Sequence, residues 1–435
     1  MGAGVLSGMR EAFTYRNARL HCDGVPAEQL VADYGTPLYV YSATSLVGRL
    51  GAFRDAFAAL DPVLAYSVKS NGNLAVLRLL AEAGAGADIV SGGELFRARL
   101  AGVPPERILF SGVGKTMVEL AAALREGIYA FNVESQGELH ALSELAVTMG
   151  MRAPVALRVN PDVDSHTPHR YTATGHGTTK FGIPYAEARA LYQVAAQLPG
   201  VRVRGVDMHI GSQILDVTPY REAIARILEL VEELRRAGHE LEFLDIGGGF
   251  GVNYDEETEP DATEFAAALG PALAASGLRI VFEPGRFISG PSGVLLTRVL
   301  YVKEMGGKTY VITDAGMNDL LRPSHYSSYH RVLPAVQRPG REHRTVDVVG
   351  PICESGDFLA LDRAMERPEP GELLAVATAG AYGFSMASTY NARPRPAEVM
   401  VQGADHRLVR RRETYDDLVR GELELLAGTH HQREP

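Results

Sequence analysis

The stretch Ala65-Tyr66-Ser67-Val68-Lys69-Ser70-Asn71 changes its hydrophobic pattern at a single lysine. Residues 62–68 are apolar and partly β-branched, as in a buried strand, whereas leucines recur at helical spacing after Gly72. Lys69 therefore lies where a strand gives way to a helix. Burial at such a position removes water from the amine, which favours the neutral form that attacks a carbonyl as a Schiff-base nucleophile.

A solvated lysine at a strand end is the ordinary alternative for Lys69. This alternative has less weight here, because arginine supplies nearly all of the other positive charge. The chain has five lysines, which are Lys69, Lys115, Lys180, Lys303 and Lys308. A lysine kept at an apolar strand end is therefore a candidate for chemistry.

The composition is that of a globular protein that acts on small molecules. With 435 residues, 46% of them hydrophobic, the chain can bury a large core and form more than one domain. Its net charge of −10 argues against a nucleic-acid surface. Without a membrane-length apolar stretch or a signal-like N-terminus, we expect a cytoplasmic protein. Cys22 and Cys353 cannot build a disulfide framework, and we expect no metal site.

Outward from Lys69, strand patterns and helix patterns alternate along the chain. The expected strands are residues 62–68, 86–91, 108–111, 129–133, 155–159, 203–209, 243–246 and 280–282. About eight such strand–helix units between residues 42 and 288 have the size and rhythm of an α/β protein of the (β/α)8 barrel type. A doubly wound open sheet is the alternative. Polar residues at the ends of nearly all strands favour the barrel, which collects such residues at one face.

After Arg286 the alternation with helices stops. Runs of β-branched residues separated by glycine and proline follow, so we expect residues 289–435 to form a mostly β domain. The N-terminal residues 1–41 hold short strand-like pieces that are too few for a core of their own. We therefore expect this segment to complete the sheet of the β-rich domain.

The run Asp245-Ile246-Gly247-Gly248-Gly249-Phe250-Gly251 follows an expected strand. Glycines without Cβ atoms allow successive backbone N–H groups to converge on a phosphate. A dinucleotide fingerprint would need glycine at Val252, so a nicotinamide enzyme is disfavoured. A plain tight turn remains the alternative.

Two further strand ends carry groups that suit an aromatic cofactor. Glu283 lies in Glu283-Pro284-Gly285-Arg286, and a carboxylate beside a pyridine nitrogen keeps that nitrogen protonated. Arg286 could bind a substrate carboxylate, or the two side chains could simply pair with each other. His209 could lie against the ring with Ser212 offered to its phosphate, although a lone histidine at a strand end is more often structural.

Cys353 lies in the polar turn Pro351-Ile352-Cys353-Glu354-Ser355-Gly356-Asp357. Because these surroundings are too polar for a core strand, we favour a thiol that donates a proton over an inert buried cysteine. An amine, a phosphate-binding glycine run, an acid for a ring nitrogen and a stacking histidine together predict one cofactor, pyridoxal 5'-phosphate.

The chain resembles the diaminopimelate decarboxylases, which are fold-type III, alanine-racemase-like pyridoxal enzymes. The motifs are YSVKSN at 66–71, NVES at 132–135, KFGI at 180–183, HIGSQI at 209–214, DIGGGFG at 245–251, EPGR at 283–286, NDLLRPSHY at 318–326, GPICESGD at 350–357 and AYGFSMASTYNARPRPAEV at 381–399. The resemblance spans nearly the whole chain. The segment 172–179, TATGHGTT, departs from the usual pattern of the family and is expected to flank the site.

The resemblance implies a role for each candidate residue. Lys69 would carry the cofactor, His209 would stack on its ring, and Glu283 would face the pyridine nitrogen. The implied cofactor-binding residues also include Asp88, Ser212, Gly247, Gly248, Gly249 and Tyr382. The implied substrate-binding residues are Arg286, Arg322, Tyr326, Glu354 and Tyr382. In such enzymes the cysteine at the position of Cys353 comes from the partner subunit, which implies a homodimer with shared active sites.

The expected reaction is the decarboxylation of meso-2,6-diaminopimelate to L-lysine and CO2, the last step of lysine biosynthesis. A decarboxylase of ornithine, arginine, lysine or carboxynorspermidine on the same fold is one alternative. A non-catalytic homologue that binds pyridoxal phosphate is the other. The residues that bind the distal end of the substrate, among them Arg322 and Glu354, would distinguish the first alternative.

Overall fold

The structure is a computed structural model that describes residues 12–164, 167, 169, 179–255 and 261–428. The chain divides into two compact units, residues 45–290 and residues 1–44 with 291–435. These divisions lie within three residues of the boundaries expected at 42 and 288. Among the described residues, no helix has both the length and the apolar character needed to cross a membrane.

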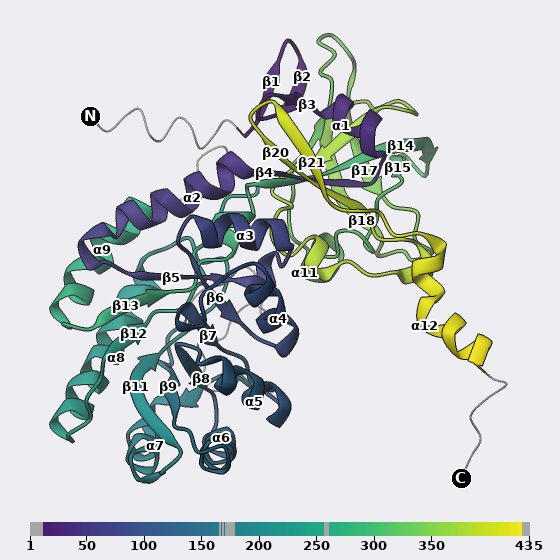
Figure 1. Cartoon of the computed structure of the whole chain (residues 1–435). Helices are drawn as coiled ribbons and strands as arrows, with labels where there is room; N and C mark the ends of the chain where they lie inside the picture. The colour runs from purple at the N-terminus through teal and green to yellow at the C-terminus, as the bar shows by residue number, and fades with distance from the viewer. Residues whose placement is uncertain (1–11, 165–166, 168, 170–178, 256–260, 429–435) are drawn as a thin grey trace. The chain divides into compact units, whose positions relative to one another are not determined.

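Eight parallel strands of residues 45–290 close into a barrel (Figure 1). They pair in the order β9, β11, β12, β13, β5, β6, β7, β8, and β8 also pairs with β9. Their bounds are Val63–Ser67 (β5), Gly86–Ile89 (β6), Ile108–Phe110 (β7), Ala130–Val133 (β8), Ala153–Asn160 (β9), Val201–Asp207 (β11), Phe243–Asp245 (β12) and Arg279–Phe282 (β13), and the short β10 (Ile183–Pro184) pairs beside β9. The predicted barrel is confirmed, and the open sheet is excluded.

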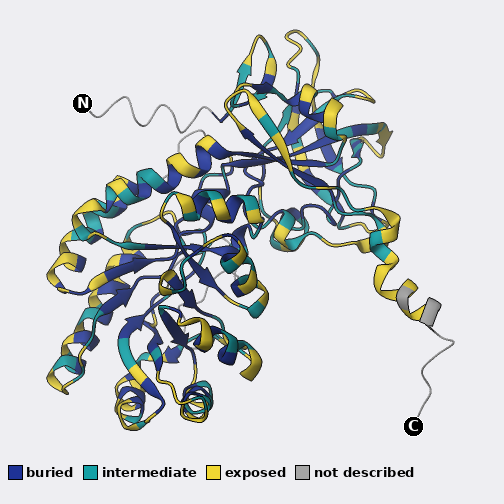
Figure 2. Ribbon diagram, in the orientation of Figure 1, coloured by how far each residue is buried: buried dark blue, intermediate teal, exposed yellow. Residues whose placement is uncertain are grey.

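Helices surround the barrel and bury only their inner faces (Figure 2). They are α2 (Ala43–Ala56), α3 (Leu74–Glu82), α4 (Gly92–Leu100), α5 (Met117–Glu126), α6 (Gln136–Thr148), α7 (Tyr185–Gln197), α8 (Thr218–Arg236) and α9 (Ala262–Ala275). Four consecutive helices begin with a capping side chain, from Asn73, Ser91, Thr116 and Ser135. Each cap satisfies a backbone N–H that would otherwise lack a partner, so these helices start at fixed points after their strands.

The interior of the barrel is apolar at the level just before the carboxyl ends of its strands. Ala65, Leu109, Ala130, Ala156, Phe243 and Val281 form one buried cluster, with a single residue from each of six strands. Side chains alternate between the two faces of a strand, so the residue two positions further along also points inward. That next inward position is where the barrel becomes polar.

The second unit is built on a nine-stranded sheet that the N-terminal segment completes. Strand β4 (Leu38–Ser42) pairs with β14 (Gly293–Met305) on one side and with β20 (Ala397–Gln402) on the other, as Figure 1 shows. The other strands are β15 (Lys308–Thr313), β16 (Val332–Pro334), β17 (His343–Val349), β18 (Phe358–Glu366), β19 (Leu373–Val376) and β21 (Asp405–Arg410). Apolar side chains of β4, β14 and β20 pack into one core, so the expected mostly β domain is confirmed.

Several elements of the β domain were absent from the sequence prediction. Helix α1 (Ala27–Tyr34), strands β2 (Arg19–Cys22) and β3 (Val25–Pro26), and helices α11 (Arg322–Tyr326) and α12 (Tyr415–Gly428) belong to this group. So do strands β18 and β21. Strand β21 lies at the sheet edge and is mostly polar, with three charged residues of its six, so it lacks an apolar alternation. Strand β1 (Phe13–Arg16), which pairs with β2, corresponds to one of the expected strand-like pieces of the N-terminal segment.

Candidate active site

A layer of polar side chains lies next to the apolar cluster of the barrel, toward the carboxyl ends of the strands. The strand register pairs Arg158 with Asp207 and Asp207 with Asp245, and paired residues of a parallel sheet face the same side. Each of the eight strands contributes one buried polar residue at or just after its end: Ser67, Asp88, Ser111, Asn132, Arg158, Asp207, Asp245 and Glu283. Closure of the barrel thus gathers residues that are separated by up to 216 positions, the span from Ser67 to Glu283.

Lys69 stands at the edge of this layer, in a short 3-10 turn that follows β5. Its Nζ lies 2.5 Å from Asp88 Oδ2, and Ser67 Oγ donates a hydrogen bond to the same oxygen at 2.8 Å. The Lys69 side chain is 35% exposed, whereas Asp88 is fully buried. The sequence analysis expected desolvation to favour the neutral amine. The structure adds an opposing effect, because the neighbouring carboxylate favours the ammonium form. Asp88 is also placed to take a proton when the amine reacts.

His209 follows β11 and presents a neutral ring. The backbone N–H of Gly248 donates to His209 Nδ1 at 3.2 Å, so Nδ1 is an acceptor and the neutral ring carries its hydrogen on Nε2. The pKa of His209 lies well below its ordinary value because the ring is desolvated and because Arg158 and Lys69 are near. A planar neutral imidazole at this position suits the expected stacking against an aromatic ring.

The glycine run fits tightly between two neighbouring loops. A Cβ atom on Gly248 would collide with the backbone oxygen of Glu283, and one on Gly249 would collide with that of Gly211. The N–H of Gly247 donates to Asp245 Oδ1 at 2.9 Å. The N–H groups of Gly247 and Gly248 are thus used within the protein, which differs from the expectation that all three glycines point their N–H groups at a phosphate. Glycine is required here for close packing.

Arg286 lies beside Ser212. Its Nη2 donates to Ser212 Oγ at 3.0 Å, and its Nη1 donates to the hydroxyl of Tyr254 at 2.7 Å. The arginine side chain is buried. The guanidinium thus adds positive charge next to Ser212, the predicted phosphate residue.

The acids of the polar layer outnumber its cations. Asp88, Glu134, Asp207, Asp245 and Glu283 are buried carboxyl groups, whereas Lys69 and Arg158 are the cations that face them. Five acids against two cations leave three negative charges unbalanced. Burial, followed by the other carboxylates, raises the pKa of Asp207, Asp245 and Glu283 well above their ordinary values. These three acids therefore hold their protons more tightly than exposed carboxyl groups do.

Glu134 holds the rim of the barrel together. Its Oε1 accepts from Arg158 Nη1 at 2.9 Å and from the N–H of Gly112 at 2.8 Å, while its Oε2 accepts from the N–H of Gly182 at 3.0 Å. The carboxylate and the guanidinium are both buried. This ion pair keeps Arg158 fixed among the acids. Residues 172–178 of the atypical TATGHGTT segment lie outside the described residues.

The remaining predicted residues belong to the β domain. Arg322 begins α11, is buried, and donates from Nη1 to His330 Nε2 at 2.8 Å, while Tyr326 ends the same helix. Cys353 is exposed and its N–H donates to Asn391 Oδ1 at 3.0 Å; the neighbouring Glu354 accepts from the hydroxyl of Tyr390. Tyr382 has a left-handed backbone with φ of 55°. Their placement at the cofactor site stays a prediction.

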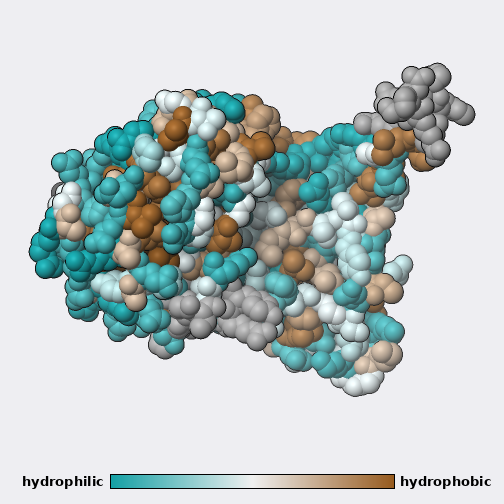
Figure 3. Space-filling view, turned by 90° about the horizontal axis from the view of Figure 1, so that it is seen from below, coloured by the Kyte–Doolittle hydropathy of each residue, from teal (hydrophilic) through white to brown (hydrophobic). Residues whose placement is uncertain are grey.

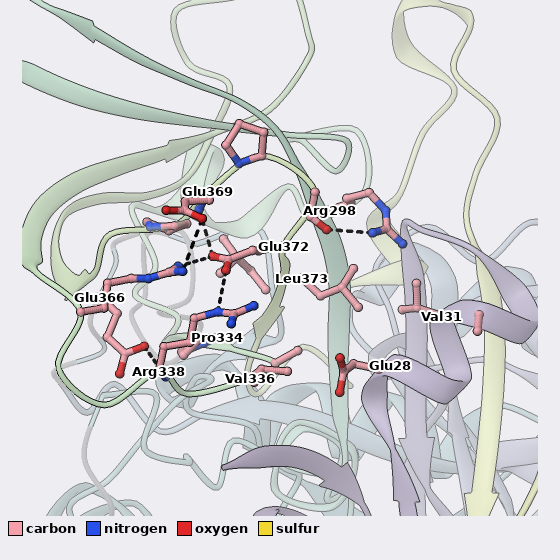
Figure 4. A pocket seen from close by; sticks show the side chains of 17 residues that line it. Glu28, Val31, Arg298, Pro334, Val336, Arg338, Glu366, Glu369, Glu372 and Leu373 are labelled. Carbon is pink, nitrogen blue, oxygen red and sulfur yellow. Dashed lines mark hydrogen bonds and ion pairs between the residues drawn. The ribbon is translucent and has the colours of Figure 1, made fainter.

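A pocket of about 520 Å³ opens within the β domain (Figure 4). Charged side chains line it, but Arg338 and Arg341 both pair with Glu372, at 2.8 and 2.6 Å. Pockets that bind small molecules are mostly apolar with a few convergent polar groups. Because its charges satisfy one another, we assign no ligand to this pocket and place the chemistry at the barrel.

Sequence reasoning had missed part of the polar layer. It singled out Lys69, Asp88, His209 and Glu283, but it assigned no role to Asp207 or Asp245. The signal was present, because each of these acids stands two positions after an inward-facing residue. Assuming a closed barrel and assigning every second residue of each strand to its interior would have identified both acids.

Comparison with known families defines the class of protein. Residues 44–290 match the family described as pyridoxal-dependent decarboxylase, pyridoxal binding domain. The matched range covers the barrel and all of its polar layer. The protein is thus a pyridoxal-dependent decarboxylase of the barrel type.

Curated relatives define the family more narrowly. Diaminopimelate decarboxylase of Aquifex aeolicus is 48% identical over 94% of this chain and 97% of its own length, and that of Neisseria meningitidis serogroup B is 47% identical over 94% and 99%. The solved diaminopimelate decarboxylase from Helicobacter pylori, complexed with L-lysine, superposes with a TM-score of 0.87 at 40% identity, covering 91% of this chain and 99% of that one. The chain belongs to the diaminopimelate decarboxylase family.

Pyridoxal 5'-phosphate is the cofactor of this enzyme, and the barrel residues fit it. One primary amine, a neutral imidazole and a buried acid of raised pKa lie in the same barrel, at Lys69, His209 and Glu283. The glycine run lies between His209 and Glu283, and a Cβ atom on any of its three glycines would collide with a neighbouring residue. Within the described residues, Asp88 Oδ1 is buried without a hydrogen-bond partner, as a group facing a ligand would be.

Proposed function

We propose that this protein removes CO2 from meso-2,6-diaminopimelate and yields L-lysine. The near full-length identity with curated diaminopimelate decarboxylases carries this proposal. The Helicobacter pylori relative was solved with L-lysine, which the proposed reaction forms. A lysine/ornithine decarboxylase from Vibrio vulnificus matches at 24% identity, a likeness that shows the fold alone.

We infer the roles of the barrel residues from their contacts. When bound, pyridoxal phosphate would supply a ring that accepts the electron pair left on the substrate carbon when CO2 departs. Lys69 is the covalent anchor, and Asp88 accepts the proton that its amine gives up. Glu283 holds a proton at the ring nitrogen, and His209 lies flat against the ring. Ser212 binds the phosphate, and the glycine run at 247–249 lies against it; the N–H groups of Gly247 and Gly248 donate within the protein, so these two glycines contribute close approach and not donors.

We also propose roles for residues of the β domain. Tyr382 contributes to the binding of both the phosphate and the substrate. Arg286, from the barrel, and Arg322 bind carboxylate in the planar, two-pronged geometry for which lysine is a poor replacement. Tyr326 and Glu354 contact the distal amino-acid end of the substrate. Cys353 of the partner subunit donates the proton that replaces the carboxyl group.

A shared site requires a homodimer. Exposed apolar side chains support a contact between copies: Leu423, Leu425 and Leu426 of α12 are 50%, 72% and 69% exposed, and apolar atoms gather on this helix in Figure 3. We place the enzyme in the cytoplasm, where free cysteines such as Cys22 and Cys353 are usual. Fractionation of cells would test that location.

Two experiments test the function. Cofactor-loaded protein is incubated separately with meso-diaminopimelate, ornithine, arginine and lysine, and CO2 release is measured. Release from meso-diaminopimelate alone is expected, and faster release from another substrate would overturn the proposal. Lys69→Ala should abolish both turnover and the absorbance that arises from the covalent bond between the lysine and the cofactor; retention of both contradicts the role of Lys69.

Mixing two inactive variants tests the shared site. In a hybrid dimer, Lys69→Ala and Cys353→Ala fall in the same site only when the cysteine of that site comes from the partner subunit, and the other site is then intact. If Cys353 acts across the interface, an equal mixture regains one intact site in each hybrid dimer, which is about 25% of wild-type activity after random exchange. No recovery, despite subunit exchange shown by mass spectrometry, would place Cys353 and Lys69 of one subunit together.

A further inference from the structure

Asn132 lies at the centre of the polar layer and has no established role. The residue belongs to β8 and is fully buried. Its amide nitrogen lies 3.3 Å from Glu283 Oε1, 3.2 Å from Asp245 Oδ2 and 3.2 Å from Ser111 Oγ. Since carboxylate oxygens surround this end of the amide, the nitrogen must face them and the oxygen must point away.

Three acceptors compete for the two hydrogens of this amide. Ser111 relieves the competition, because its hydroxyl also lies 3.3 Å from Glu283 Oε1 and can donate to that oxygen. Asp245 relieves it further when it is protonated, since a neutral acid needs fewer donors. Glu283 is then the group on which the hydrogen bonds of Asn132 and Ser111 converge.

We propose that Asn132 is a positioning residue that, together with Ser111, keeps Glu283 in its carboxylate form and aimed at the ring nitrogen of the cofactor. This inference rests on the proposed role of Glu283. Hydrogen bonds donated to a carboxylate favour the charged form, whereas burial and nearby acids favour the neutral one. A Glu283 that keeps its own proton cannot stabilise a charged ring.

The groups around Glu283 explain why it needs this help. Asp245 and Asp88 face it from β12 and β6 and repel a negative charge on Glu283, and Asp207 faces it from β11. Lys69 and Arg158 attract that charge, but each already pairs with another carboxylate, Asp88 and Glu134 respectively. The amide of Asn132 is the neutral donor that favours the ionised form without adding a charge.

The test measures the ring nitrogen directly. Apoprotein is loaded with pyridoxal phosphate that carries 15N in its ring, and the 15N chemical shift reports whether this nitrogen is protonated. In Asn132→Ala and in the apolar, similarly sized Asn132→Leu, we expect the shift to move toward the unprotonated value. The kcat should fall about tenfold, as for one unit of pKa, while KM changes less than twofold.

Asn73→Ala is the matched control. Asn73 is also buried and also sits on a barrel loop, but its side chain caps α3 at Ala75 and the cap lies outside the carboxyl layer. This variant should keep the wild-type 15N shift. If Asn132→Ala fails to fold, Asn132→Leu decides, because it preserves the volume. A wild-type shift in a folded Asn132 variant overturns the inference.

Glu283→Gln separates this inference from the proposal beneath it. If Glu283→Gln moves the 15N shift and the Asn132 variants do not, Glu283 keeps its role and Asn132 loses the one proposed here. If Glu283→Gln itself leaves the shift unchanged, the assignment of Glu283 fails and the inference on Asn132 fails with it.

Discussion

Asp207→Asn should stabilise the protein in a way that depends on pH. Asp207 is buried, and its Oδ1 has no hydrogen-bond partner among the described residues. Burial, and then the charge of Glu283, raise its pKa well above the model-compound value of 3.8. The folded chain therefore holds a proton that the unfolded chain has released, and rising pH weakens the folded state. Asparagine keeps the shape and removes this proton.

The size of the effect follows from counting protons. Each proton that the folded chain binds and the unfolded chain lacks costs about 1.4 kcal/mol of stability per pH unit. The window lies above the unfolded pKa of Asp207 and below its folded pKa. Within that window, the gain of Asp207→Asn over wild type should thus grow by about 1.4 kcal/mol for each unit by which the pH rises.

Urea unfolding of the full-length protein without cofactor, followed at several pH values, measures this gain. Asp55→Asn is the matched control, because this substitution makes the same chemical change at an exposed residue of α2. Its unfolding free energy should run parallel to wild type. If Asp207→Asn also runs parallel to wild type across this window, Asp207 holds no extra proton and the charge balance of the polar layer is wrong.

Three further changes test neighbouring parts of the barrel. Glu134→Gln breaks a buried ion pair and should lower the free energy of unfolding by about 3 kcal/mol, measured in urea. Gly248→Ala should weaken cofactor binding in absorbance titrations, since its Cβ would collide with the backbone of Glu283, whereas Gly270→Ala, in open space on α9, should bind normally. Burial raises the pKa of Glu94 to about 7. The free energy of unfolding of Glu94→Gln, relative to wild type, should therefore increase by up to about 3 kcal/mol as the pH rises to about 7, and no further above it. A difference that still increases at pH 8 would contradict this.

The sequence predicted the barrel because its strands are apolar and its helices are periodic. Strand β5 and helix α3 show this, since the pattern changes at Lys69 and Asn73 caps the helix. The β domain was harder to predict. Its edge strand β21 is mostly polar, and β18 contains Asp362 in a left-handed backbone conformation, so neither strand has a simple alternation.

The sequence indicates a candidate site residue when that residue alone stands out beside an apolar strand. It does not indicate residues whose role depends on contacts with several others. Lys69, His209 and Glu283 each stand out beside an apolar strand. Asn132 and Asp245 are 113 positions apart, and their contact exists only because the barrel closes. A linear sequence reveals polar residues at strand ends, but it does not show which acids share a proton, because that depends on distances across the barrel.

The polar layer links the stability of the barrel to its chemistry. A barrel with apolar side chains in place of Asp207 and Asp245 would avoid burying unbalanced charge and would be more stable. Such a barrel would also remove the carboxyl groups of β11 and β12 that oppose a negative charge on Glu283. With these acids present, the carboxylate form of Glu283 depends on the hydrogen bonds that Asn132 and Ser111 donate to it. The cost of burying these acids falls on the folding of the apoprotein, where the Asp207→Asn experiment measures it.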